Sequence, residues 1–247
     1  MALHFLVEDA AEVAEGDVVV LTGAEAHHAA TVRRVRVGEQ VTVGDGRGLW
    51  AEGVVEAAAP REVSVRVTTR REVPARTPRL VLVQALAKGD RDELAVQAAT
   101  ELGVDAIVPW QAARSVSRWD AAKAEKGRTR WAGIVREAAK QAHRAWIPEV
   151  ETVASTAQIA ARAAASVVLV LEPTASERLS DRVRALPPTG DAEILLVVGP
   201  EGGIDPREIA EFTAAGAFPV RLGESVLRTS TAGPAALAAV EVCLGRW

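Results

Sequence analysis

Residues 193–216, EILLVVGPEGGIDPREIAEFTAAG, decide the fold class of this chain. The uninterrupted apolar run ILLVV is typical of a strand that is buried on both faces of a parallel sheet. After a glycine-rich loop, a helix begins with three start signals, because Asp205 is a capping residue, Pro206 suits the first position and Glu208 completes a capping box. Gly216 marks its end. The stretch therefore predicts a strand–loop–helix unit of an α/β domain.

The same alternation of strands and helices extends over residues 80–247. Apolar strands are predicted at residues 80–86, 105–110, 166–173, 193–200 and 217–222, and further helices at 92–102, 123–143 and 231–244. Apolar strands separated by helices indicate a mostly parallel sheet. The small residues of the last helix either allow a backbone, another helix or a partner subunit to approach closely, or simply favour an alanine-rich helix.

The N-terminal part has a different pattern. Short strands are predicted at residues 3–7, 18–22, 40–45, 50–55 and 63–69, with a helical insert at 25–36. Gly44–Gly48 lie between two strand-like runs and no helix follows them, so they predict a hairpin turn and not a phosphate loop. We therefore expect a small β domain over residues 1–72, a polar, proline-containing linker at 73–79 and an α/β domain over 80–247.

Composition limits the class of protein. Of 247 residues, 49% are hydrophobic and 25% are charged, which excludes wholesale disorder, collagen-like repeats and coiled coil. Cys243 is the only cysteine, so an internal disulfide and a cysteine-bound structural metal are excluded. The chain shows neither a secretion signal pattern nor an 18-residue apolar run, so we expect a cytoplasmic protein that makes no use of a membrane.

Charge is unevenly spread along the chain. The net charge is −4, yet residues 114–144 hold nine Lys and Arg against three acids, a local excess of +6. This basic block either forms a footprint for nucleic-acid phosphates or is an ordinary solvated helix face. Tryptophans add a similar ambiguity, because they stack on bases or fill a core. The candidates are Trp50, Trp110, Trp119, Trp131 and Trp146.

Several common catalytic motifs are absent from the sequence. It contains no GxGxxG, GxxxxGK[ST], GxSxG or HExxH motif, and its four histidines lack metal-ligand spacing. Instead, polar and glycine-rich loops follow three predicted strands, at residues 171–173, 199–203 and 222–229. Ligands bind at the carboxyl ends of strands in open parallel sheets, so these loops predict one pocket. We expect Arg228, in the third loop, to be buried there.

These loops carry a resemblance to a known family. VVGPEGG at 197–203 and LGESVLRTSTA at 222–232 resemble the signature pair of the SPOUT methyltransferases, specifically the ribosomal RNA small subunit methyltransferase E family. GAEAHHAATVRRVRVGE at 23–39 resembles the family's PUA-like N-terminal domain, and residues 84–116 and 137–144 resemble its central segments.

The resemblance implies a fold, a reaction and partners. The implied fold is a small PUA-like β-barrel followed by a SPOUT domain with a deep trefoil knot. The implied reaction transfers a methyl group from S-adenosyl-L-methionine to N3 of a uridine in small-subunit (16S) ribosomal RNA. The implied partners are that RNA in the small ribosomal subunit and a second copy of the chain, without a metal ion.

The resemblance also assigns the cofactor to the three loops. The residues it places there are Leu171, Glu172, Pro173, Val198, Gly199, Gly203, Leu222, Gly223, Val226 and Leu227. For RNA phosphates, the basic side chains of the two domains are the candidates. They are Arg33, Arg34, Arg36, Arg114, Arg118, Lys123 and Arg144.

Two side chains are candidates for catalysis. Uridine N3 is protonated at neutral pH, so its reaction needs proton removal or stabilisation of negative charge. Arg228 suits charge stabilisation because a guanidinium is permanently charged and directional, although a structural salt bridge is the alternative. Glu201 either accepts the proton, orients the substrate or caps its own loop.

Two departures from the family pattern leave other functions open. Ser230 stands where the family usually has Glu, and Ala142-His143 stand where it often has Ser-Gly. A carboxylate role at position 230 is therefore in doubt. The alternatives are a SPOUT-type methyltransferase that acts on another RNA, such as tRNA, and a non-catalytic RNA-binding or ribosome-assembly protein.

Overall fold

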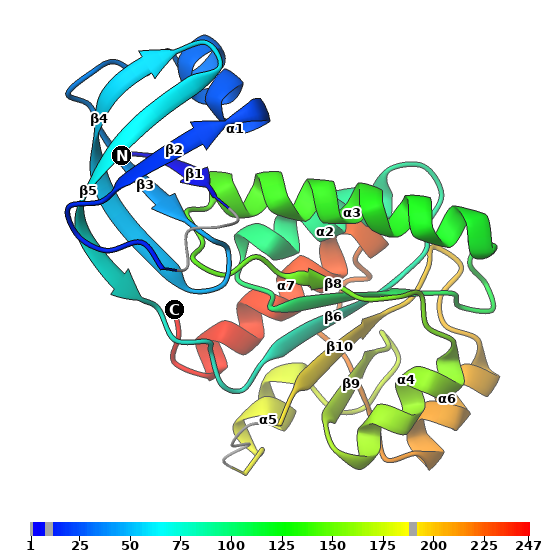
Figure 1. Ribbon diagram of the computed structural model, residues 1–247. Coiled ribbons are helices and arrows are strands. Elements are labelled where there is room, and N and C mark those ends of the chain that lie inside the picture. Colours follow the sequence, from blue (N-terminus) through cyan, green and yellow to red (C-terminus); the bar gives the residue numbers. More distant parts are fainter. Residues whose placement is uncertain (1, 8–11, 188–191) are drawn as a thin grey trace. The chain divides into compact units, whose positions relative to one another are not determined.

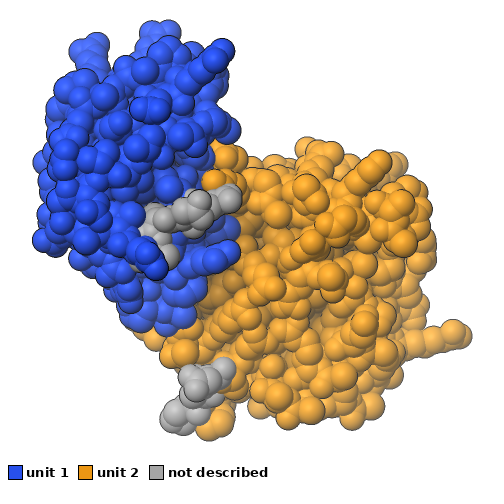
Figure 2. Space-filling view, in the orientation of Figure 1, with its two compact units in different colours: residues 1–75, 139–147 blue, residues 76–138, 148–247 orange. Residues whose placement is uncertain are grey.

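The computed structural model of the chain describes residues 2–7, 12–187 and 192–247 and divides into two compact units. Unit 1 comprises the described residues up to 75 together with 139–147, and unit 2 comprises 76–138 and the described residues from 148 onwards (Figure 2). The sequence predicts one boundary, at the linker 73–79. The structure additionally groups 139–147, which includes the end of a long helix, with unit 1.

Unit 1 is built on a curled five-stranded sheet (Figure 1). Its strand order is β1 (Leu3–Leu6), β3 (Gln40–Gly44), β4 (Leu49–Ala59), β5 (Glu62–Glu72) and β2 (Val18–Thr22). β1 pairs in parallel with β3, and the other neighbours are antiparallel. The five predicted strands and the predicted hairpin between β3 and β4 are confirmed.

The helical insert of unit 1 is shorter than predicted. α1 (Gly23–His27) continues into a π-helical turn, η1 (His28–Val32), and no helix extends to residue 36. The turn closes when the Arg33 amide donates to the His28 carbonyl at 2.8 Å. Arg34 then adopts φ 55°, in the left-handed region that ends a right-handed helix.

Unit 2 contains a six-stranded sheet in which every pair is parallel, as the sequence predicts. Its order is β11 (Phe218–Val220), β9 (Val167–Leu171), β10 (Ile194–Val198), β6 (Leu80–Ala85), β7 (Ala106–Trp110) and β8 (Glu149–Val150). Successive side chains such as Leu82 and Val83 point to opposite faces of a strand, and both are buried, so both faces of the sheet are covered. The carboxyl ends of neighbouring strands therefore meet at one edge of the sheet.

Helices cover both faces of this sheet. The predicted helices correspond to α2 (Arg91–Glu101), α3 (Ala121–Gln141), α6 (Pro206–Ala214) and α7 (Thr229–Cys243). α2 and α7 pack together on one face, while α6 and α4 (Thr156–Ala161) lie on the other (Figure 1). The sequence does not predict α4, α5 (Leu179–Arg184), the turn η2 (Arg162–Ala164) or the strand β8, which are all short. No helix within the described ranges is long and apolar enough to cross a membrane.

The capped helix α6 confirms its predicted boundaries. The Asp205 carboxylate accepts from the first-turn backbone, and the Glu208 carboxylate accepts from the Asp205 amide, which completes the capping box. Gly216 has φ +97°, which suits glycine at a helix end. In α7, a Cβ at Gly233 would lie 2.9 Å from Leu82, so this glycine lets the helix approach its own sheet.

A buried histidine anchors the interior of unit 1. His4 stacks on Trp50 at 4.5 Å between ring centroids, and its Nδ1 lies 2.9 Å from the Thr42 hydroxyl. Burial, followed by the positive charges of His143 and Lys140, lowers the pKa of His4 from 6.5 to about 4. Folded unit 1 therefore keeps this imidazole neutral at neutral pH.

Residues 139–147 join unit 1 through specific bonds. Lys140, only 6% exposed, forms an ion pair with Glu25 at 2.7 Å. The Trp146 indole donates to the Val73 carbonyl at 2.8 Å. The Ile147 amide donates to the Gly46 carbonyl at 2.9 Å.

We expect unit 1 to lose stability as the pH falls, because unfolded His4 takes up a proton below pH 6.5 whereas folded His4 resists protonation until about pH 4. Its free energy of unfolding should be about 2 kcal/mol lower at pH 5 than at pH 7.5. Native-state hydrogen exchange of the β3 and β4 amides measures this difference. His4→Phe keeps an aromatic ring against Trp50 and removes the titration, so the difference should shrink by that amount. An equal pH dependence in both proteins would contradict the assignment.

Candidate functional site

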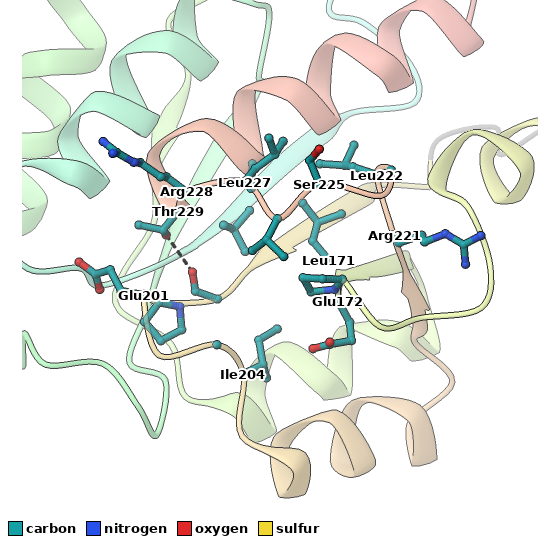
Figure 3. A pocket seen from close by; sticks show the side chains of 18 of the residues that line it. Leu171, Glu172, Glu201, Ile204, Arg221, Leu222, Ser225, Leu227, Arg228 and Thr229 are labelled. Carbon is teal, nitrogen blue, oxygen red and sulfur yellow. Dashed lines mark hydrogen bonds between the residues drawn. The ribbon is translucent and has the colours of Figure 1, made fainter.

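A cavity of about 510 Å³ lies at the carboxyl ends of β9, β10 and β11 in unit 2 (Figure 3). Loops that follow these three strands line it, together with Arg91 from α2 and the start of α7. The structure brings all the predicted cofactor and catalytic residues to this one cavity. They are Leu171, Glu172, Pro173, Val198, Gly199, Glu201, Gly203, Leu222, Gly223, Val226, Leu227 and Arg228.

The cavity has an apolar middle with charged side chains on two sides. Figure 3 shows Leu171 and Ile204 near the middle, Glu201 and Arg228 on one side, and Glu172 and Arg221 toward the other. An apolar lining with a few convergent polar groups is typical of small-molecule sites, and the volume falls in their usual range of roughly 300–1,000 Å³. The arrangement suits a ligand with a flat apolar part and a polar reacting part.

The loop after β10 owes its shape to glycines. The Gly203 amide donates to the Pro200 carbonyl at 2.9 Å, which closes a turn, and Gly203 has φ +70°. A Cβ at Gly199 would lie 2.6 Å from the Ile204 side chain. Gly199 therefore allows the loop to fold back on itself.

Four groups outside this loop donate hydrogen bonds to it. The Thr229 hydroxyl donates to the Gly199 carbonyl at 2.8 Å. The Arg114 guanidinium donates to the Gly202 carbonyl at 3.1 Å. The Glu201 carboxylate accepts from Arg91 at 2.7 Å and from the Lys88 amide at 3.0 Å. The loop is thus fixed by residues that the sequence places far from it.

Glu201 is held in its ionised form. Partial burial raises its pKa, but hydrogen bonds from its own amide, from Arg91 and from the Lys88 amide together lower the pKa below its ordinary value. A carboxylate with a lowered pKa is a poor proton acceptor at neutral pH. This geometry favours the loop-capping and orienting roles of Glu201 over proton removal.

Arg228 is exposed, and the expectation that it would be buried is wrong. It is the residue before α7, so its side chain leaves the helix at its start, while its carbonyl accepts from the Thr231 and Ala232 amides. Among the described residues, its guanidinium has no hydrogen-bond or ion-pair partner. The alternative of a structural salt bridge therefore finds no support there.

Three arginines of unit 1 are available for a ligand. Arg33, Arg34 and Arg36 are exposed, and none of them forms an ion pair within the described part of the chain. Arg34 has a positive φ. Such backbone strain in a non-glycine residue often accompanies functional sites.

The basic block is less available than its charge count indicates. Five of its nine cations form ion pairs with carboxylates. These pairs are Arg114–Asp205, Lys123–Asp120, Arg128–Glu125, Arg130–Glu93 and Lys140–Glu25. Arg118 donates to the Ala113 carbonyl, and Arg144 is half-buried with further contacts. Asp205, Glu93 and Glu25 lie outside the block, so these three partners offset half of its local excess of +6.

The tryptophans divide between core and partly exposed positions. Trp110 and Trp131 are buried, and Trp50 is 8% exposed, so these three belong to the core and a base-stacking role for them is wrong. Trp119 and Trp146 are half-buried. The described residues contain no cluster of three or more His, Cys, Asp or Glu that is placed to hold a metal ion.

Comparison with known proteins follows the two units. A family model described as an RNA methyltransferase domain matches residues 75–241, and one described as an RNA methyltransferase PUA domain matches 21–68. The ribosomal RNA small subunit methyltransferase E of Mycobacterium bovis is 50% identical over 237 residues, which cover 94% of this chain and 89% of that protein. The chain belongs to the ribosomal RNA small subunit methyltransferase E family.

Two solved structures resemble this family member along almost its entire length. A methyltransferase from Legionella pneumophila, solved with its cofactor SAM, has a TM-score of 0.85 and 30% identity, and the match covers 98% of each chain. A ribosomal RNA small subunit methyltransferase E from Neisseria gonorrhoeae, bound to S-adenosyl methionine, has a TM-score of 0.86 and 26% identity, with the same coverage.

Several residues that line or support the cavity of this family member were not among the predicted site residues. Arg91 lies in the segment KGDR, which the family resemblance includes, but nothing local to it indicates a partner more than 100 residues away. Thr229 directly follows Arg228, and Ile204 directly follows the glycine loop. Thr229 and Ile204 could have been predicted only from their positions next to predicted site residues in the sequence.

Gly199→Ala should destabilise unit 2 by about 1–3 kcal/mol, because the new methyl group overlaps Ile204, which is itself buried. Thermal unfolding measures the effect. Gly223→Ala is the matched control, since a Cβ there meets no atom within 4 Å.

The double variant Gly199→Ala, Ile204→Ala tests whether overlap with Ile204 causes the loss of stability in Gly199→Ala. It should be less destabilised than the sum of the two single variants, because removing the Ile204 side chain relieves the overlap. Strict additivity would show that the loop does not depend on this close approach.

Proposed function

We propose that this chain is an S-adenosyl-L-methionine-dependent methyltransferase that modifies N3 of a uridine in small-subunit ribosomal RNA. One observation carries the proposal: the residues that family resemblance assigns to the cofactor and to catalysis all line one cavity. Two relatives that match this chain over 98% of its length bind S-adenosylmethionine in their solved structures. The names of the matched relatives support ribosomal RNA as the substrate.

Finer features of the fold are part of this proposal. β10 follows both β6 and β9 in the chain and yet lies between them, an order that is consistent with a deep trefoil knot in a SPOUT domain. The curled sheet of unit 1 and its family match support a PUA-like barrel that binds RNA. A homodimer remains a prediction from the family resemblance. A cytoplasmic location remains a prediction from the sequence.

The residues of the cavity suit the proposed chemistry. The cofactor would be held among the loops after β9, β10 and β11, and when bound it supplies an electrophilic methyl group. Loss of the N3 proton to solvent leaves negative charge on N3 and the uracil oxygens, and this charge disappears as N3 bonds to the methyl carbon and the carbon–sulfur bond breaks. The unpaired guanidinium of Arg228 would stabilise this charge. Glu201, which stays ionised, would orient the base through its carboxylate.

Methylation of ribosomal subunits from a strain that lacks this gene tests the function. The purified protein is incubated with labelled S-adenosylmethionine and either small subunits or bulk tRNA, and the modified nucleotide is mapped. We expect a single 3-methyluridine in small-subunit RNA. Labelling of tRNA alone would show that tRNA is the substrate. RNA binding without any methyl transfer would indicate a non-catalytic assembly protein.

Arg228→Lys should lower the single-turnover rate by about 10²–10³-fold, because lysine retains the charge but loses the planar donor pair. Affinity for S-adenosylmethionine, measured by calorimetry, should stay within a few-fold of the wild type, since the charge appears only during transfer. Loss of cofactor affinity in proportion to the rate would make Arg228 a binding residue instead.

Replacing Arg33, Arg34 and Arg36 by Ala should weaken RNA binding at low salt. Each lost phosphate contact reduces the slope of log affinity against log salt by about 1. The double variant Lys123→Ala, Arg128→Ala is the control, because these cations already pair with Asp120 and Glu125. Equal slopes for both variants would contradict the assignment of RNA binding to the unit 1 arginines.

A further inference from the structure

A buried chain of hydrogen bonds joins three elements beneath the cavity. The Gln84 side-chain amide, at the end of β6, donates to the Thr229 hydroxyl at 2.9 Å. That hydroxyl, at the start of α7, donates to the Gly199 carbonyl at 2.8 Å (Figure 3). Gln84 is fully buried and Thr229 is 6% exposed. Water therefore does not compete for these bonds.

The direction of each bond in this chain is fixed. A carbonyl accepts only, so the single hydroxyl proton of Thr229 goes to Gly199, and the hydroxyl oxygen must accept from Gln84. The Gln84 amide nitrogen also donates to the Ala85 carbonyl at 3.2 Å, which sets the orientation of the amide. Gln84 and Thr229 therefore each require a polar side chain, and an apolar side chain of the same shape does not replace either of them.

The chain of bonds links the two parts of the site that must act together. Gly199 begins the glycine loop, which also carries Glu201. Thr229 directly follows Arg228 and is the first residue of α7. Because the Arg228 guanidinium has no partner among the described side chains, the hydrogen bonds around Arg228 hold its backbone only.

We infer that Gln84 and Thr229 are positioning residues that set Arg228 against the glycine loop for methyl transfer. This inference rests on the proposed function. Neither side chain acts on the substrate: both act through the position of the Arg228 backbone. A displacement of about 1 Å in a reacting group costs on the order of 10²-fold in rate.

Thr229→Val tests the inference because valine has the shape of threonine without its hydroxyl. At saturating S-adenosylmethionine, the single-turnover rate should fall by about 10²-fold, and Thr229→Ser should restore most of it. Thr100→Val is the matched control, since Thr100 is also fully buried in unit 2 and donates to a backbone carbonyl, that of Val96. This control should lose stability and keep the wild-type rate.

A double-variant cycle separates positioning from a general loss of stability. If Thr229 acts through Arg228, adding Thr229→Val to Arg228→Ala should lower the rate little further. Multiplication of the two effects would overturn the inference. So would a Thr229→Val rate equal to that of Thr100→Val.

Hydrogen exchange supplies a readout that does not need methyl transfer. The Thr231 and Ala232 amides bond to the Arg228 carbonyl, so their exchange should accelerate in Thr229→Val and in Gln84→Leu, and not in Thr100→Val. Unchanged exchange would overturn the inference even in an active enzyme. A wild type that neither binds S-adenosylmethionine nor transfers methyl would overturn the proposed function instead, and the exchange data would still decide whether the bonds set the start of α7.

Discussion

The parallel pairing of β10 with β9 on one side and β6 on the other is the constraint on which the candidate site depends. In this register Val197 lies beside Val170, and Val198 lies beside Gln84. Neighbouring strands therefore end at the same level of the sheet, and the loops that follow them begin side by side. Strands buried on both faces carry mostly apolar side chains, and the buried polar side chain of Gln84 lies near the end of its strand. Glycine, carboxylate and guanidinium groups therefore gather at the carboxyl edge, and the helices that follow supply the bonds that hold them.

The sequence predicts what depends on neighbouring residues. Apolar runs mark the strands of unit 2, and capping signals place α6 because both act within a few residues. Short elements such as β8 and α5 are not predicted, because two to six residues are too few to show a periodic pattern. The sequence also does not predict that residues 139–147 belong to unit 1. This grouping depends on contacts such as that of Trp146 with Val73, which form only in the folded chain.

The site shows the same division between local and distant information. Its twelve predicted residues lie at the ends of strands or in the loops that follow them, where the topology of a parallel sheet predicts a ligand. Their identities came from family resemblance. The ion pairs that decide which charges are available were not predictable, because partners such as Glu93 and Arg130 or Glu201 and Arg91 are remote in sequence. The exposure of Arg228 likewise depends on the path of the chain into α7.

The grouping of residues 139–147 with unit 1 has a consequence for synthesis of the protein. The chain emerges from the ribosome N-terminus first, so the strands of unit 1 are available long before Lys140 and Trp146 have been made. Until then Glu25 lacks its buried cation and the Val73 carbonyl lacks its indole donor. Unit 1 can complete its packing only after more than sixty residues of unit 2 have also left the ribosome. A fragment that stops at residue 75 lacks residues 139–147, and with them Lys140 and Trp146.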